Sequence, residues 1–321
     1  MKDKLSWVFS LKFVGIIAVI LGHFSSPFSE FIYSWHMPLF FMLSGFFITV
    51  TAPLNYLVKK DFNRLMVPYF IFSFIALIIT ALKLFLLGRP QLNYVNEVLS
   101  IIFWMDYQHL KNTYGFVLWF LPALFLGRIF YYLVEKVSKN KVFQLITYAS
   151  LFLLSFKLNL PLGITNGLNC VIWIFIGKVI FNYLADDWLC KIKSSVALIL
   201  SFGVIFSIYY LNKVPSLDMS LLKYSDVILS LIWAVSILIF LIVFFKSFFR
   251  DFQDNSVIKM WAAGTMLLFI IHPYTNNIGY LVAQKVGFDF WFVKLFITLS
   301  ILHLLLLIKE RNKNWFIFKY V

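Results

Sequence analysis

The sequence predicts an all-α integral membrane protein, a polytopic helical bundle that crosses the bilayer about ten times with both termini in the cytoplasm. Three observations lead to this fold class: 62% of the 321 residues are apolar, only 13% are charged, and the apolar residues occur in long runs separated by short basic stretches. A soluble domain keeps a largely polar surface, so it could not bury this much apolar side-chain area. Soluble enzymes, disordered chains and disulfide-bonded secreted scaffolds are therefore excluded.

Ten apolar segments account for the predicted spans. A bilayer core about 30 Å thick requires roughly 20 apolar residues per helix. The segment 143–158 is short for a span, and Pro38 lies inside the segment 31–50. The chain from 1 to 321 is predicted to form one transmembrane domain, with no soluble domain. The ten segments are 7–25, 31–50, 65–87, 115–134, 143–158, 167–184, 195–211, 226–245, 260–281 and 291–308.

The formal net charge of +14 is interpreted as a signal of topology. With ten spans, seventeen Lys and Arg residues lie in the terminal tails and the even-numbered connections, whereas the odd-numbered connections hold five. Cytoplasmic loops of membrane proteins are enriched in Lys and Arg. The asymmetry therefore predicts cytoplasmic termini, and it accounts for the positive charge without a nucleic-acid partner.

The longest predicted external connection and the two cysteines complete this outline. The connection is 88–114, in which the apolar run 101–105 is expected to form a short helix at the membrane surface. Cys170 and Cys190 are too few and too far apart for a disulfide framework or a metal site. Both are expected to be packing residues, and no metal is expected.

The first segment contains two ionisable residues, which are costly inside a membrane and are therefore candidate functional groups. Lys12 and His23 are eleven residues apart, so on a helix they share one face about 16 Å apart along the axis. A cation at the predicted cytoplasmic end suits an anion such as phosphate, and a histidine suits proton transfer. The alternative interpretation is a snorkelling lysine and a histidine that only packs.

His36 opens the second segment at a depth close to that of His23. Two histidines at similar depth on consecutive helices are able to converge on one polar pocket. The alternative is an interfacial histidine beside an aromatic belt. Pro38 is compatible with a helix that starts at His36, because the first turn of a helix needs no backbone donor.

Longer motifs surround these residues. Together they resemble the acyltransferase-3 family of integral-membrane O-acyltransferases, which modify bacterial surface glycans and related molecules. Two positions depart from the family: Phe9 stands where many members have Asp, and Lys12 replaces the commoner Arg, which removes a bidentate fork for phosphate. The motifs are Lys12 with ten residues before His23, Leu21-Gly22-His23, HMPLFFMLSG at 36–45, KDFNRLMVPY at 60–69, LWFLPALF at 118–125 and Ile271-His272-Pro273.

The resemblance implies transfer of an acyl group, most often acetyl, from acyl-CoA to a hydroxyl of a cell-surface polysaccharide or lipid-linked glycan. Acyl-CoA is then a co-substrate, and no permanently bound cofactor is expected. A multi-pass protein of a bacterial plasma membrane is implied, whose partners are acyl-CoA, the glycan acceptor and the lipid bilayer. Some proteins with this pattern are assigned to transport, so the alternative is an exporter or transport subunit for a glycan or lipid-linked precursor.

The resemblance also implies roles for single residues. His23 is expected to act as general base, and His36 to orient it, to bind the acceptor or to carry a second proton. The remaining assignments are Lys12, Lys59, Lys60 and Arg64 to the CoA phosphates, and Trp119 and His272 to the substrate.

Several roles stay open at this point. Direct transfer is favoured over an acyl-enzyme on Ser44, Cys170 or a tyrosine, because none of these residues has a base at a suggestive spacing. Ser44 and Tyr69 are the candidates for an oxyanion donor. His109, which follows Asp106 in the external connection, either touches the glycan acceptor or faces solvent, and His303 is expected to be structural.

Overall fold

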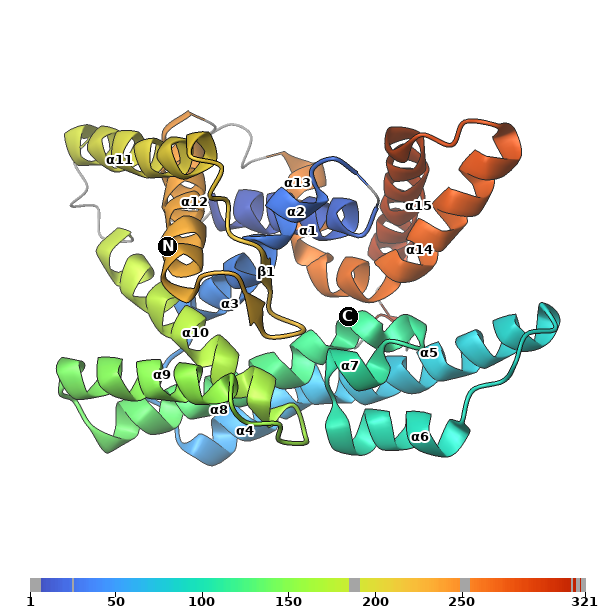
Figure 1. Cartoon of the computed structure of the whole chain (residues 1–321), viewed down its shortest axis with the longest axis horizontal. Helices are drawn as coiled ribbons and strands as arrows, with labels where there is room; N and C mark the ends of the chain where they lie inside the picture. Colours follow the sequence, from blue (N-terminus) through green and yellow to red (C-terminus); the bar gives the residue numbers. More distant parts are fainter. Residues whose placement is uncertain are drawn as a thin grey trace.

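The computed structural model describes residues 7–24, 26–184, 191–248, 255–312, 314–315 and 318; Cys190 and both chain termini lie outside these ranges. The structure is 79% helical with almost no sheet (Figure 1). Its elements in chain order are α1 (Trp7–Gly22), α2 (Ser29–Tyr33), α3 (His36–Phe46), α4 (Leu54–Asp61), the π-helical turn η2 (Phe62–Met66), α5 (Val67–Leu86), α6 (Tyr94–Leu99), the π-helical turn η3 (Ser100–Trp104), α7 (Tyr107–Leu110), the 3-10 helix η4 (Tyr114–Trp119), α8 (Phe120–Val137), α9 (Lys141–Ser155), α10 (Ile164–Leu184), α11 (Lys191–Tyr210), the antiparallel strands β1 (Leu217–Asp218) and β2 (Lys223–Tyr224), α12 (Val227–Phe248), α13 (Ser256–Ala263), α14 (Thr265–Val286) and α15 (Trp291–Arg311).

The predicted apolar segments are mainly helical within the described residues. In the described part of the chain, five helices are long and apolar enough to cross a membrane, and there are up to six if the bent pair α13 and α14 forms one span. Four further apolar helices are shorter, among them α1 and α9. The helical membrane fold is therefore confirmed. The count of about ten spans and the cytoplasmic termini stay predictions.

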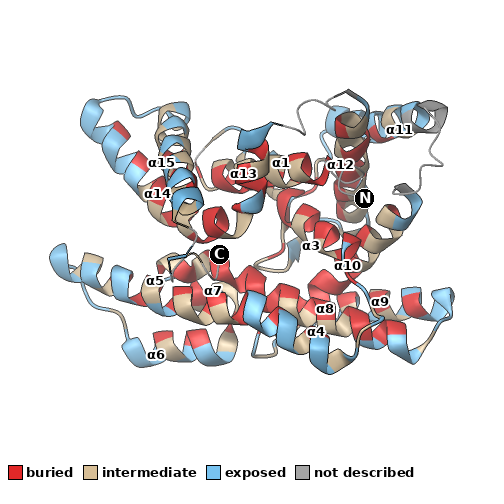
Figure 2. Cartoon of the chain, turned by 180° about the vertical axis from the view of Figure 1, so that it is seen from behind, coloured by how far each residue is buried: buried red, intermediate tan, exposed pale blue. Residues whose placement is uncertain are grey.

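Apolar side chains cover the outer faces of several long helices. Only 17% of the most apolar 18-residue stretch of α15 is buried inside the protein. Phe296 and Leu304 are among the exposed side chains of this helix. Buried residues concentrate in α1, α3 and α8, while α11, α15 and the C-terminal part of α14 are more exposed (Figure 2). Because exposed apolar area is unfavourable in water, these faces are suited to lipid.

The segment 31–50 is divided between two helices. α2 ends at Tyr33 and α3 begins at His36, with Trp35 at a φ of −145° between them. Pro38 explains the division, because in a continuous helix its ring would clash with the carbonyl of Ser34 four residues earlier. The new start puts Pro38 in the first turn of α3, where no donor is required. It also makes His36 the first residue of α3.

The segment 260–281 is also divided. α13 and α14 meet at Gly264 with a bend of 80°. A Cβ atom at Gly264 would lie 2.2 Å from Cδ2 of Leu306 on α15, so glycine permits this close approach. Pro273, in contrast, lies inside α14 without ending it. The carbonyl of Phe269, four residues before Pro273, therefore lacks its usual backbone donor.

Helices α3 and α10 pack backbone against backbone. A Cβ atom at Gly45 would lie 2.1 Å from the carbonyl oxygen of Ile174, and one at Gly177 would lie 2.0 Å from that of Met42. Small residues permit such close contact between helices in a membrane. This contact fixes the position of α3, which begins with His36.

We expect Gly177→Ala to destabilise the protein by about 1–3 kcal/mol, because the added methyl group must displace the backbone of α3. Gly203→Ala on α11 is the matched control, since a Cβ atom there meets nothing within 4 Å. Thermal unfolding in detergent micelles checks both variants. Equal midpoints for the two would contradict the close contact between α3 and α10.

Candidate active site

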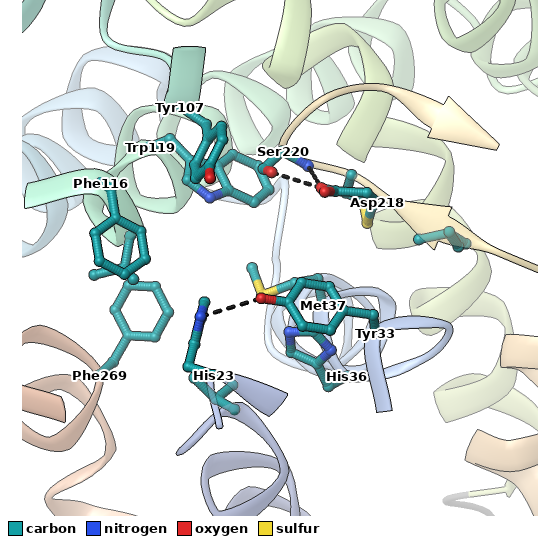
Figure 3. Close-up of a pocket in the computed structure, with 14 residues that line it drawn as sticks. His23, Tyr33, His36, Met37, Tyr107, Phe116, Trp119, Asp218, Ser220 and Phe269 are labelled. Atoms are coloured by element: carbon teal, nitrogen blue, oxygen red, sulfur yellow. Dashed lines mark hydrogen bonds between the residues drawn. The ribbon is translucent and has the colours of Figure 1, made fainter. Parts of the chain in front are cut away.

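A small cavity of about 50 Å³ lies where α1, α2, α3, η4 and the β1–β2 hairpin meet. We call it the histidine cavity, and its polar lining includes His23, Tyr33, His36, Trp119 and Asp218 (Figure 3). His23 follows the last residue of α1, and Tyr33 and His36 flank the break between α2 and α3. The break within the segment 31–50 thus places Tyr33 and His36 at the same cavity.

Backbone carbonyl groups hold two imidazoles of this region. Nδ1 of His36 lies 2.8 Å from the carbonyl oxygen of Ile32, and Nδ1 of His272 lies 2.8 Å from that of Phe269. A carbonyl oxygen only accepts hydrogen bonds, so both Nδ1 atoms carry the hydrogen and donate it. In the neutral imidazole Nε2 is then left with its lone pair. The carbonyl that Pro273 leaves without a donor is the one that His272 satisfies.

His23 lies between a phenol and the imidazole of His272. Its Nδ1 is 3.1 Å from the hydroxyl oxygen of Tyr33, and its ring centroid is 5.0 Å from that of His272. His272 is fully buried, and its Nε2 has no hydrogen-bond partner among the described residues. An unpaired acceptor inside an apolar region is costly. The Nε2 atom is therefore an unsatisfied acceptor beside the ring of His23.

A second cavity, of about 440 Å³, is lined by Lys12, Arg64 and Arg128, and we call it the cationic cavity. Arg128 donates from Nε to Oδ2 of Asp61 at 2.6 Å, and Arg64 lies 3.8 Å from the other oxygen of Asp61. Arg128 also donates to Oγ of Ser44 at 3.0 Å. Three cations thus line this cavity and two of them share the buried carboxylate of Asp61, so the balance of charge favours an anionic ligand.

An aromatic wall separates the two cavities. Phe269 lines both, and the consecutive residues Trp119 and Phe120 line the histidine cavity and the cationic cavity respectively. Phe120 and Phe269 contact each other with their ring centroids 5.3 Å apart. The helix α1 carries Lys12 to one cavity and His23 to the other, as their spacing predicts.

The structure brings some of the predicted residues together and leaves others apart. Lys12 and Arg64 line the cationic cavity; His23, His36 and Trp119 line the histidine cavity, and His272 packs against His23. Lys59 and Lys60 lie exposed on α4 and do not line the cationic cavity.

Other candidates have partners of their own. The hydroxyl group of Tyr69 donates to the carbonyl of Ile101 at 2.9 Å, away from both cavities. The thiol of Cys170 is buried and donates to the carbonyl of Ala123 at 3.1 Å, and Nδ1 of His303 accepts from Nε1 of Trp261 at 3.1 Å. These contacts fit packing roles for Cys170 and His303.

Four residues of the site are absent from the sequence-based prediction: Tyr33, Asp61, Arg128 and Asp218. Arg128 carried a usable signal, because it is a charged residue inside the predicted span 115–134. Tyr33 stands three residues before His36 but resembles any interfacial tyrosine. Asp218 reaches the cavity on a hairpin of two-residue strands, which leaves no periodic pattern in the sequence.

Comparison with known proteins gives one family match. A family model described as an acyltransferase domain, acyltransferase 3, covers residues 5–308 of the chain. No curated protein and no solved structure matches the sequence.

We expect Arg128→Met to lower the free energy of unfolding by about 3–5 kcal/mol, because it leaves the carboxylate of Asp61 buried and without its closest cation. The matched control is Lys141→Met, which removes an exposed lysine 3.9 Å from Glu135 and is expected to cost less than about 1 kcal/mol. Denaturant unfolding measures both. A double variant with Asp61→Asn should recover part of the loss, and a loss unchanged by that second substitution would contradict the ion pair.

Proposed function

Because the chain belongs to the acyltransferase 3 family and is an acyltransferase that transfers groups other than aminoacyl groups, we propose that it moves an acyl group, foremost acetyl, from acyl-CoA to a hydroxyl of a cell-surface polysaccharide or lipid-linked glycan. The observation that carries the proposal is the shared wall between the cationic cavity and the histidine cavity. A polyanionic donor and a basic imidazole would meet across that wall. We place the protein in a bacterial plasma membrane.

The cationic cavity suits the donor. Coenzyme A carries several phosphate groups, and Arg and Lys side chains bind phosphate by charge-assisted hydrogen bonds. Arg128 adds a guanidinium group to the predicted pair Lys12 and Arg64, which supplies a planar fork that Lys12 lacks. Lys59 and Lys60 remain on the exposed face of α4, where they would attract the donor from solution without holding it.

The histidine cavity suits only a small part of the acceptor. Its volume of about 50 Å³ is well below the roughly 300–1,000 Å³ of a typical ligand pocket. A single hydroxyl-bearing group fits such a space, while the rest of the glycan stays outside. For the thioester to reach that hydroxyl, the two cavities must join, and Phe269 is the side chain whose movement would join them.

The proposed reaction is direct transfer. With Nδ1–H of His23 donating to the oxygen of Tyr33, Nε2 of His23 takes the proton of the acceptor hydroxyl. The hydroxyl oxygen attacks the thioester carbonyl carbon, the carbon–sulfur bond breaks, and the departing thiolate receives the proton from His23. His36 and His272 each offer an Nε2 lone pair that would bind a neighbouring hydroxyl or share the proton.

Two contacts support direct transfer over an acyl-enzyme. Oγ of Ser44 accepts from Arg128 and lies in the cationic cavity, with no histidine among that cavity's lining. Cys170 is buried against the carbonyl of Ala123. A nucleophile that forms an acyl-enzyme needs a base within hydrogen-bond reach, and neither residue has one.

We expect His23→Ala to lower the transfer rate by about 10²–10⁴-fold, the contribution of a general base, with little change in folding. Tyr33→Phe keeps the ring but removes the oxygen that orients His23, so a smaller loss of about 10-fold is expected. Release of free CoA thiol, measured with purified protein and a glycan extract, gives the rates. The matched control is His303→Gln, because His303 packs against Trp261 away from both cavities.

The same variants test the function in cells. Mass analysis of surface glycans should show an acyl mass increment in cells with the gene, none without it, and none when the gene carries His23→Ala. An exporter would behave differently: glycans would be lost from the surface without a change in their acyl mass. No acyl difference between the first two strains would overturn the transferase proposal.

A further inference from the structure

A third cavity, of about 530 Å³, is lined by residues of α6, η3 and α7 and by the loop before α6 (α6 and α7 are labelled in Figure 1). Its lining is unusually rich in side-chain amides, and we call it the amide cavity. The amides belong to Gln91, Asn93, Asn96, Gln108 and Asn112. Among the described residues, no Lys or Arg lines it. Its volume falls within the usual range for ligand pockets.

The amide cavity contains a buried carboxylate. Glu97 is 4% exposed and accepts through Oε1 from Nδ2 of Asn112 at 2.9 Å. A buried carboxylate is costly unless hydrogen-bonded, and this one has no ion-pair partner among the described residues. The second oxygen of the carboxylate is an acceptor for a donor brought by a ligand.

One wall of the amide cavity is an ordered aromatic surface. The ring of Trp104 stacks on that of His109 with centroids 4.3 Å apart and planes 2° from parallel. His109 is held in turn by Asp106, whose carboxylate lies 2.8 Å from Nδ1. A rigid indole offers a large apolar contact at low cost in conformational entropy. Trp104, from the predicted apolar run 101–105, and His109 thus form one aromatic wall of the amide cavity.

We propose that the amide cavity binds neutral sugar residues of the acceptor glycan, next to the sugar that receives the acyl group. Sugar hydroxyls both donate and accept hydrogen bonds, and side-chain amides offer both functions. The apolar face of a pyranose ring packs on an aromatic ring such as that of Trp104. Glu97 and Asp106 would repel phosphate, so the same cavity disfavours CoA. The proposal rests on the proposed function.

The amide cavity and the histidine cavity share the helix α7. In α7, Tyr107 lines the histidine cavity, whereas the next two residues, Gln108 and His109, line the amide cavity. One short helix therefore forms part of both walls. A glycan held in the amide cavity would keep its reactive hydroxyl near His23 while its further units remain bound.

Binding is tested without the donor, using the full-length protein in lipid nanodiscs. The probes are short neutral oligosaccharides of glucose, galactose and N-acetylglucosamine, with oligogalacturonate as the anionic comparison, read by saturation-transfer NMR and titration. We expect at least one neutral probe to bind, and the affinity to fall about tenfold or more, equivalent to about 1.4 kcal/mol or more, in Trp104→Ala and in the double variant Asn96→Ala/Gln108→Ala.

The controls separate this proposal from failures of folding and of the proposed function. Trp104→Phe retains an aromatic surface and should keep most of the affinity, and Gln284→Ala changes an exposed amide outside the cavity and should keep all of it. His23→Ala should lose acyl transfer yet bind the probe normally. Binding of no neutral probe, binding of oligogalacturonate alone, or equal affinity in the cavity variants and Gln284→Ala would overturn the proposal.

Discussion

The orientation of two imidazoles at the histidine cavity depends on two backbone carbonyl groups. Ile32 and Phe269 each accept the Nδ1 hydrogen of a histidine, which fixes one tautomer and leaves the Nε2 lone pair as an acceptor. In an apolar interior, polar groups find their partners within the protein. The backbone of the helices therefore also selects the tautomers of His36 and His272.

Two prolines lie close to these carbonyl groups along the chain and change their backbone hydrogen bonding. Pro273 leaves the carbonyl of Phe269 without its backbone donor, and the preceding histidine fills the position. Pro38 forces a new helix to start at His36, which leaves Ile32 in the separate helix α2. A proline that starts one helix and a proline inside another thus accompany the two carbonyl groups that bind imidazoles.

The position of α3 has a different origin. Its contact with α10 relies on Gly45 and Gly177, where any side chain would enter the opposite backbone. One side of α3 is therefore held by glycine contacts with α10, and the other side carries His36 toward His23. A site built on a short, anchored helix keeps its geometry better than one built on a loop.

Much of the fold and part of the candidate site could be predicted from the sequence. Helix positions could be predicted because apolar runs are long, and helical periodicity alone placed Lys12 and His23 on one face of the first helix, about three turns apart. The helix start at His36 could be predicted with Pro38 in its first turn, but the break at Gly264 could not be located, since a glycine inside an apolar run also occurs in unbroken membrane helices. Arg128 and Asp61 come together only through tertiary contacts, which leave no mark on the local pattern. The amides of the third cavity all lie within 91–112, but their convergence depends on how α6, η3 and α7 fold together.

Charge is distributed unevenly among the three cavities. Lys12, Arg64 and Arg128 gather on the side of the aromatic wall away from His23, whereas the acidic groups Asp218, Glu97 and Asp106 lie at or beside the histidine cavity and the amide cavity. A polyanionic donor would be attracted to the first side and repelled from the second. A neutral acceptor would be indifferent to this field and would be selected by hydrogen bonds and aromatic contact. Under the proposed function, the wall at Phe269 therefore stands between two electrostatic environments, with the donor on the side of Lys12 and the acceptor on the side of His23.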